Sequence, residues 1–234
     1  MVFGICKSAL AAACGMFVFG LAGTGTAQAA TIIAYPAAPN TATLAPTFVN
    51  GVFGTVGDSL ARGPGLVLAS GGTFNSNNFT VPSPGNFAGA AAAGDYLTFG
   101  FSTTTPVDLT DMDIRYDRSG TGPNNAQLQV SINNGPFVDF FTDAAVSDLG
   151  EDNLGISLAA FTNVTDAEFR LVAFGSSGAT GTFDIETINF ANGGTVGIEI
   201  RGMAVVPEPA TVSMLGLGLI GLAFAARRRA AKAE

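Results

Sequence analysis

The chain has 234 residues, a formal net charge of −8, 47% hydrophobic residues and no histidine. The missing histidine excludes Ser-His-Asp and Cys-His catalysis and the usual zinc sites, because all of these need an imidazole. Residues 30–204 contain five arginines, no lysine and 16 acids, a net charge of −11. This part lacks the basic footprint that binding to nucleic acid or anionic lipid requires.

The first 29 residues have the pattern of a secretory signal peptide. Lys7 provides a short basic region, residues 8–23 are apolar, and Ala27-Gln28-Ala29 places small residues where a signal peptidase requires them. We expect signal peptidase to cleave at this site. An uncleaved anchor helix and a lipoprotein modified at Cys14 are the alternatives.

Thiol and amine chemistry are excluded from the chain that follows this signal. Both cysteines, Cys6 and Cys14, lie inside the signal, and the two lysines are Lys7 and Lys232. The exported part therefore has no disulfide, no Schiff base and no Ser-Lys dyad. A glycosidase with paired carboxylates is the enzymatic alternative. The domain has no tryptophan and three tyrosines to stack on a sugar ring, so we expect it not to be an enzyme.

Residues 30–204 are predicted to form one exported all-β domain. Large apolar residues alternate with small or polar ones in seven segments: Tyr96–Phe101, Met112–Tyr116, Leu128–Ile132, Phe137–Phe140, Phe169–Phe174, Phe183–Phe190 and Val196–Ile200. Asn133-Asn134-Gly135 predicts a hairpin between two of them. Residues 73–94 predict a long irregular loop. Short strands without helices between them indicate an antiparallel β-sandwich or jelly roll, with a core filled mostly by phenylalanine.

Acidic residues next to one predicted strand suggest a calcium site. Asp108, Asp111 and Asp113 are closely spaced, and Asp117 follows the strand. Oxygen ligands at such spacing could hold calcium, although a solvated strand face has the same pattern. No other metal and no cofactor are expected.

Two further groups of charged residues are expected to have structural roles. Arg115 and Arg118 flank a predicted turn and should pair with nearby carboxylates; the alternative is a bidentate contact to a ligand. Asp148, Glu151 and Asp152 are expected to form an acidic loop.

The last segment, residues 205–231, combines three unlike features in a fixed order. Pro207-Glu208-Pro209 forms an extended elbow, because proline fixes the backbone and removes amide donors. Residues 210–226 carry no charge, and a helix over them would span about 25 Å, enough for one transmembrane helix. The basic cluster Arg227, Arg228 and Arg229 should stay on the cytoplasmic side, which places residues 30–204 outside the cell.

This order resembles the PEP-CTERM sorting signal of bacterial surface proteins. The resemblance implies that an exosortase-type membrane enzyme recognises Pro207, Glu208 and Pro209 and cuts near them. It implies a membrane helix over 214–226 and a cytoplasmic stop at the three arginines. It also implies a final location at the cell surface or in the extracellular matrix, with an association with exopolysaccharide and biofilm. Ala-Ala-Lys-Ala-Glu after the arginines departs from the family pattern.

Three internal segments carry a second resemblance. Residues 114–123, 169–171 and 181–185 resemble the exported domain often found before PEP-CTERM tails, which is similar to jelly-roll carbohydrate-binding modules. Together the two resemblances imply a non-catalytic surface or matrix protein. The expected partners are exosortase, signal peptidase, exopolysaccharide and the membrane. A carbohydrate-active hydrolase and a permanently anchored surface protein remain the alternatives.

Overall fold

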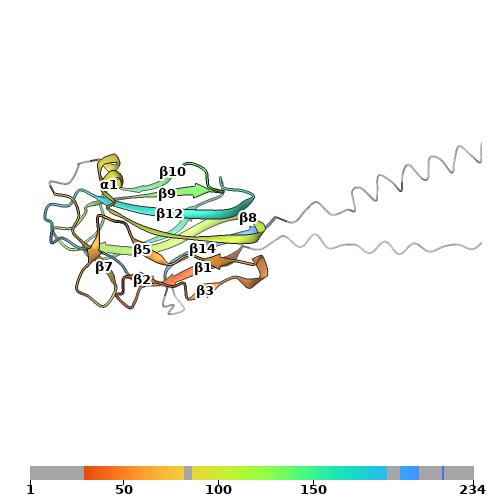
Figure 1. The fold of residues 1–234 in the computed structure, drawn as a ribbon, viewed down its shortest axis with the longest axis horizontal. Coiled ribbons are helices and arrows are strands. Elements are labelled where there is room, and N and C mark those ends of the chain that lie inside the picture. The colour runs from red at the N-terminus through yellow and green to blue at the C-terminus, as the bar shows by residue number, and fades with distance from the viewer. Residues whose placement is uncertain (1–28, 82–85, 189–195, 206–217, 219–234) are drawn as a thin grey trace, which may run out of the picture.

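The computed structural model describes residues 29–81, 86–188, 196–205 and 218. They form an antiparallel β-structure with one short α-helix, which confirms the all-β prediction (Figure 1). The described strands are β1 Ala30–Pro36, β2 Thr43–Leu44, β3 Phe48–Val49, β4 Val56–Gly57, β5 Leu60–Arg62, β6 Val67–Leu68, β7 Phe74–Asn77, β8 Tyr96–Arg118, β9 Asn125–Ile132, β10 Val138–Asp143, β11 Glu151–Ser157, β12 Val164–Phe174, β13 Phe183–Ile185 and β14 Val196–Ala204. The described helices are the 3-10 helix η1, Gly51–Phe53, and α1, Phe87–Ala93.

The strand β8 organises the whole sheet, because its 23 residues take part in two layers. Residues 96–102 pair with β12 along one edge and with β4 and β5 along the other. Residues 107–118 pair with β14 and β13 along one edge and with β11 along the other. The sequence predicted two separate strands here, whereas the chain continues as one strand through Thr103-Thr104-Thr105-Pro106.

Each half of β8 belongs to one layer of a sandwich-like arrangement (Figure 1). The first layer has the order β10-β9-β12-β8 and continues from β8 to β5 and β2. In the second layer β11 and β14 flank β8, and β1 and β3 follow β14. Strands β13, β7 and β6 extend this layer beside the end of β8.

Aromatic rings fill the space between the layers. The Tyr35 ring of β1 meets the Phe99 ring of β8 edge-on at 5.8 Å between centroids, and Phe99 stacks on Phe169 of β12 at 5.4 Å. Near the other end of β8, Tyr116 stacks on Phe183 at 5.2 Å. Seven described phenylalanines are buried in the core, fewer than predicted, because isoleucine and leucine fill much of the remaining space. Such aromatic pairs add stability beyond the area that they bury.

The predicted hairpin is confirmed. Asn133 and Asn134 have positive φ angles of 50° and 59°, and the Gly135 amide donates to the Ile132 carbonyl at 2.8 Å. Two successive left-handed residues give the tight turn whose twist matches that of the strands on either side.

The predicted loop over residues 73–94 is wrong, since it contains β7 and α1. The Asn86 side chain accepts a hydrogen bond from the Gly89 amide at 2.9 Å, and Gly94 ends the helix at φ 87°. The helix sequence Phe-Ala-Gly-Ala-Ala-Ala-Ala has almost no contrast between apolar and polar residues, so no helical period could be read from it.

Two strand assignments also need correction. Glu151 and Asp152 begin β11 and pair with Tyr116 and Arg115, so they do not belong to an acidic loop. The predicted strand Phe183–Phe190 ends at Ile185, and residues 189–190 lie outside the described residues. In both cases the extent of the strand depends on its pairing with β8, which the local sequence does not show.

Candidate functional site

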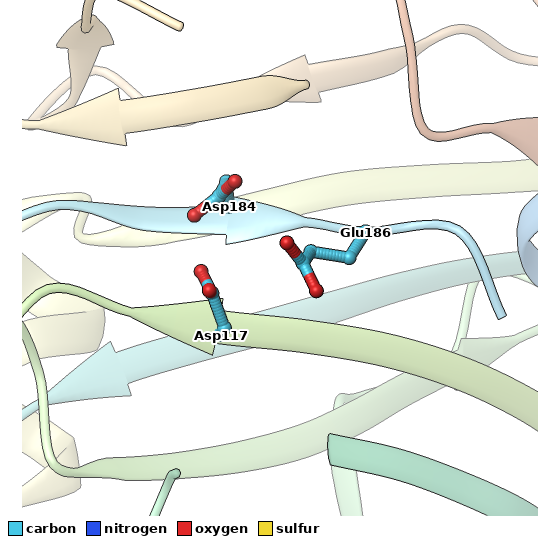
Figure 2. Close-up of side chains that lie close together, drawn as sticks. All are labelled: Asp117, Asp184 and Glu186. Carbon is cyan, nitrogen blue, oxygen red and sulfur yellow. The ribbon is translucent and has the colours of Figure 1, made fainter. Parts of the chain in front are cut away.

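Three carboxylates meet on the outer side of the second layer. Asp117 lies near the end of β8, Asp184 on β13 and Glu186 just after β13, and one oxygen of each lies within 4.8 Å of the others (Figure 2). The strand register places Asp184 directly opposite Asp117. Like charges at opposed positions destabilise a sheet, so this pair needs a compensating proton or cation.

Neighbouring donors compensate two of these three acids. The Arg115 Nε donates to Glu186 at 3.0 Å, and its Nη1 lies 3.2 Å from Asp152. The Thr73 hydroxyl donates to Asp184. Arg115 therefore links β8, β11 and the segment after β13 on the outer face of the layer.

The proximity of Asp184 makes the Asp117 carboxyl easier to protonate. Burial, followed by the hydrogen bond and the charge of Asp184, raises the pKa of Asp117 to about 7, although Arg115 acts in the opposite direction. Asp117 therefore takes up a proton at a higher pH than an ordinary aspartate does. The same oxygens are of the type that hard cations prefer.

The sequence could have revealed this cluster. Alternation within Phe183-Asp184-Ile185-Glu186 puts both acids on one face, and Asp117 directly follows the predicted strand Met112–Tyr116. The sequence does not show that β13 pairs with β8, because the paired residues are 65 or more positions apart in the chain.

The structure places the predicted calcium ligands in other contacts. Asp111 and Asp113 both accept hydrogen bonds from the Arg201 guanidinium, and Glu199 lies 2.9 Å from it. Asp108 accepts from the Asn163 amide at 2.8 Å. A cation held by Asp111 and Asp113 would have to displace Arg201. Calcium binding by these residues stays a prediction.

Arg201 is well suited to this position. Burial lowers its pKa, but the carboxylates of Asp113, Glu199 and Asp111 raise it by more, so the net shift is upward. The guanidinium is charged at any physiological pH. The register sets Arg201 opposite Asp111, which explains why an arginine belongs there.

The two predicted arginine pairings have different outcomes. Arg115 pairs with carboxylates, as expected. Arg118 instead donates to the carbonyls of Val146, Ser119 and Gly120 at 2.7, 3.2 and 3.3 Å, so its expected carboxylate pairing is wrong. The turn after β8 brings the Ser119 and Gly120 carbonyls close to its guanidinium, and the segment between β10 and β11 brings that of Val146.

A row of polar side chains crosses the outer face of the first layer. Thr98 of β8, Arg170 of β12, Gln129 of β9 and Asp139 of β10 occupy successive opposed positions. The Gln129 amide donates to Asp139 at 2.8 Å. We name these four residues the polar row. They come from four neighbouring strands, so no local pattern in the sequence brings them together.

Aromatic rings flank the polar row. The Arg170 guanidinium carbon lies 3.8 Å from the centre of the Phe137 ring and 4.8 Å from that of Tyr96. Its Nη2 also lies 3.2 Å from Glu168. These contacts hold the planar guanidinium in a defined orientation on the face of the sheet.

The sorting and processing residues lie largely outside the described residues. Ala29 is described and exposed, but Ala27, Pro207–Pro209, Arg227–Arg229 and the predicted membrane helix are not, apart from Gly218. Within the described ranges, no helix has the length and apolar character needed to cross a membrane. Strand β14 leads directly to the tail, since it ends at Ala204.

A family model for the PEP-CTERM protein-sorting motif matches residues 205–229. The chain carries a PEP-CTERM sorting motif. The match includes Pro207-Glu208-Pro209 and the three arginines, so the resemblance found in the sequence is confirmed. The PEP-CTERM motif indicates export and exosortase-dependent sorting to the cell surface or beyond it. A comparison of the chain with curated proteins found no match.

Proposed function

We propose that the chain is an exported, non-catalytic protein of the bacterial surface or extracellular matrix that associates with exopolysaccharide. The match of the sorting motif to residues 205–229 carries this proposal. The predicted signal peptide brings residues 30–204 outside, the tail holds them at the membrane by one helix, and exosortase then cuts near Pro207-Glu208-Pro209.

The outer face of the first layer supports the association with polysaccharide. The polar row offers a hydroxyl, a guanidinium, an amide and a carboxylate at successive strand positions, which suits the hydroxyl groups of a sugar chain. Tyr96 and Phe137 add apolar surface beside it. We assign the sandwich to the jelly-roll type, in line with the resemblance to carbohydrate-binding modules.

The acid cluster supports a non-catalytic role. Retaining glycosidases keep their two carboxyl groups about 5–5.5 Å apart, and inverting enzymes keep them further apart, so that the sugar or a water fits between them. Asp117 and Asp184 instead have oxygens within 4.8 Å of each other and of Glu186, on directly opposed strand positions. Thr73 and Arg115 engage the remaining members of the cluster. The arrangement is that of a structural contact between β8 and β13.

Mass spectrometry of the C-terminal peptide, from protein recovered from its own cells, tests the sorting step. We expect a C-terminus near residues 207–210 that lacks the apolar run. The variant Glu208→Ala should retain the whole tail, whereas Glu234→Ala, beyond the arginines, should be processed normally. An intact arginine tail on the wild-type protein would instead support the permanently anchored alternative.

The proposed association with polysaccharide is tested by measuring how the processed protein binds exopolysaccharide from the bacterium that produces the protein. Asp139→Ala should weaken binding about tenfold, equivalent to about 1.4 kcal/mol, if the carboxylate contacts the sugar. Asp148→Ala removes the same charge from an exposed position away from the polar row and serves as the control. Equal binding by the wild type and both variants would contradict the assignment of this face.

A further inference from the structure

Three large apolar side chains are exposed within a short segment of the chain. Phe48 on β3, Val52 in η1 and Val56 on β4 have 46%, 86% and 66% of their surface exposed. We name these three residues the apolar end. Single exposed apolar residues are ordinary, but a group of them on one short segment indicates a contact surface.

The surroundings of the apolar end are free of charge in sequence. Residues 30–57 contain no acidic or basic residue, and neither do residues 96–107, although residues 30–204 as a whole have a net charge of −11. The two segments lie together, because Val56 pairs with Ser102 and the Thr104 hydroxyl donates to the Phe53 carbonyl at 3.3 Å. These two segments are uncharged, and the first of them exposes the three apolar side chains.

This region lies where the chain leaves the domain toward its sorting tail. The Val205 amide donates to the Pro106 carbonyl at 3.0 Å, two residues along from Thr104. At the same end, Ala30 of β1 pairs with Gly202 of β14. Figure 1 shows η1 and its flanking strands, in orange, beside the bend of β8 at this end of the domain.

The tail leaves little distance between this end and a membrane. Strand β14 ends at Ala204, and the uncharged run begins at Ala210. Five residues separate them, and five extended residues span at most about 18 Å. A domain held through this connection must keep its η1 end close to the bilayer surface, since both ends of β8 lie on the opposite side of the domain.

We propose that the apolar end rests on the outer surface of the membrane while the tail is still uncut. The proposal rests on the proposed function, because it needs the tail to be inserted. An anionic lipid surface repels the acidic faces of the domain, whereas the uncharged region can approach it. Phe48, Val52 and Val56 then remove apolar area from water at the interface. The contact orients the domain so that Pro207-Glu208-Pro209 is presented at the membrane surface.

Single-cysteine labelling tests this contact in the full chain. Cys6 and Cys14 are the only cysteines, so Cys6→Ser and Cys14→Ser give a background without thiols. A polarity-sensitive fluorophore is attached through Val52→Cys, or through Val56→Cys as a second position. Leu149→Cys is the matched control, because Leu149 is also 86% exposed and precedes β11 at the opposite end of the domain. Each protein is reconstituted into vesicles of phosphatidylcholine and phosphatidylglycerol.

We expect the probes at residues 52 and 56 to shift to shorter wavelength on reconstitution and to be quenched by lipids with spin-labelled headgroups, whereas the probe at 149 stays unchanged. If the protein floats with the vesicles but the probes at all three positions show equal, water-like emission, the proposed membrane contact is wrong. The proposed sorting function is unaffected by that result. Protein that does not float with the vesicles would contradict insertion of the tail, and therefore both the proposed function and the membrane contact. A shift at residue 52 without vesicles that grows with protein concentration overturns the proposal in favour of a second copy of the chain.

Discussion

The Tyr35 hydroxyl binds both backbone groups of Gly100: it donates to the carbonyl at 2.7 Å and accepts from the amide at 3.1 Å. Tyr35 lies on β1 in the second layer and Gly100 on β8 in the first, so one phenol connects the two layers through the core. Burial, only partly offset by the hydrogen bond to Gly100, raises the pKa of Tyr35 well above its ordinary value, so the hydroxyl keeps its proton.

Removing this hydroxyl should destabilise the domain. We expect Tyr35→Phe to lower the free energy of unfolding by about 1–3 kcal/mol, because the Gly100 amide and carbonyl lose a buried partner. Urea unfolding followed by circular dichroism measures the change. Tyr96→Phe, at a partly exposed tyrosine that contacts Arg170 through its ring, should change stability by less than about 0.5 kcal/mol. Equal effects of the two variants would contradict the role given to the Tyr35 hydroxyl.

The Asp117–Asp184 pair should make stability depend on pH. The pKa of Asp117 is raised to about 7 in the folded protein, against about 3.9 in an unfolded chain. A raised acid pKa means that the contribution is fully present below the unfolded pKa and is lost as the pH rises through the folded one. We expect the melting temperature to fall between about pH 4 and 7 for this reason.

The variant Asp117→Asn isolates that effect. It should flatten the pH profile and melt higher than the wild type at pH 8, since the amide can donate to Asp184 without a titrating proton. Asp139→Asn, at an exposed acid on β10, is the control and should follow the wild-type profile. A wild-type profile that stays level through neutral pH would show that the two carboxyls do not share a proton.

Arg201 should be the most costly of the arginines to remove from the second layer. Arg201→Met leaves the carboxylate of Asp113, whose side chain is 6% exposed, without its cation. We expect a loss of about 3–5 kcal/mol in chemical unfolding, typical of breaking one partner of a buried pair. The double variant Arg201→Met with Asp113→Asn should recover part of that loss. A single variant as stable as the wild type would contradict the pairing.

The turn between β9 and β10 offers a test of backbone conformation. Asn134 has a φ of 59°, which glycine adopts freely and a β-branched residue does not. Asn134→Val should cost about 1–3 kcal/mol, while Asn134→Gly should be close to neutral. Thermal unfolding of the two variants checks this, and a valine variant as stable as the glycine variant would exclude a strained turn.

The sequence allowed prediction of features whose cause is local. Alternation predicted the central strands, and Asn133-Asn134-Gly135 predicted its hairpin because each turn residue tolerates positive φ. The order of proline elbow, apolar run and arginines predicted the sorting motif, which needs no folded partner for its recognition. Arg115 was expected to bind carboxylates because cations are scarce in an acidic domain.

Features that depend on distant pairing could not be predicted in the same way. Asp117 meets Asp184 only because β13 pairs with the end of β8. Arg201 binds Asp111 and Asp113 only because β14 pairs with the middle of β8. The continuation of β8 through Thr103–Pro106 was hidden by a proline and three threonines, which look like a turn. Helix α1 was missed because alanine gives no amphipathic contrast.

The two roles of β8 also bear on how long the exported domain survives. Because one strand supplies hydrogen-bonding edges to both layers, neither layer forms a complete sheet without it, and the domain has no half that could persist by itself. A protease that nicks the chain between Thr103 and Pro106 would divide the strand that both layers share. We therefore expect such a nick to loosen both sheets together and to speed further digestion of the exported domain.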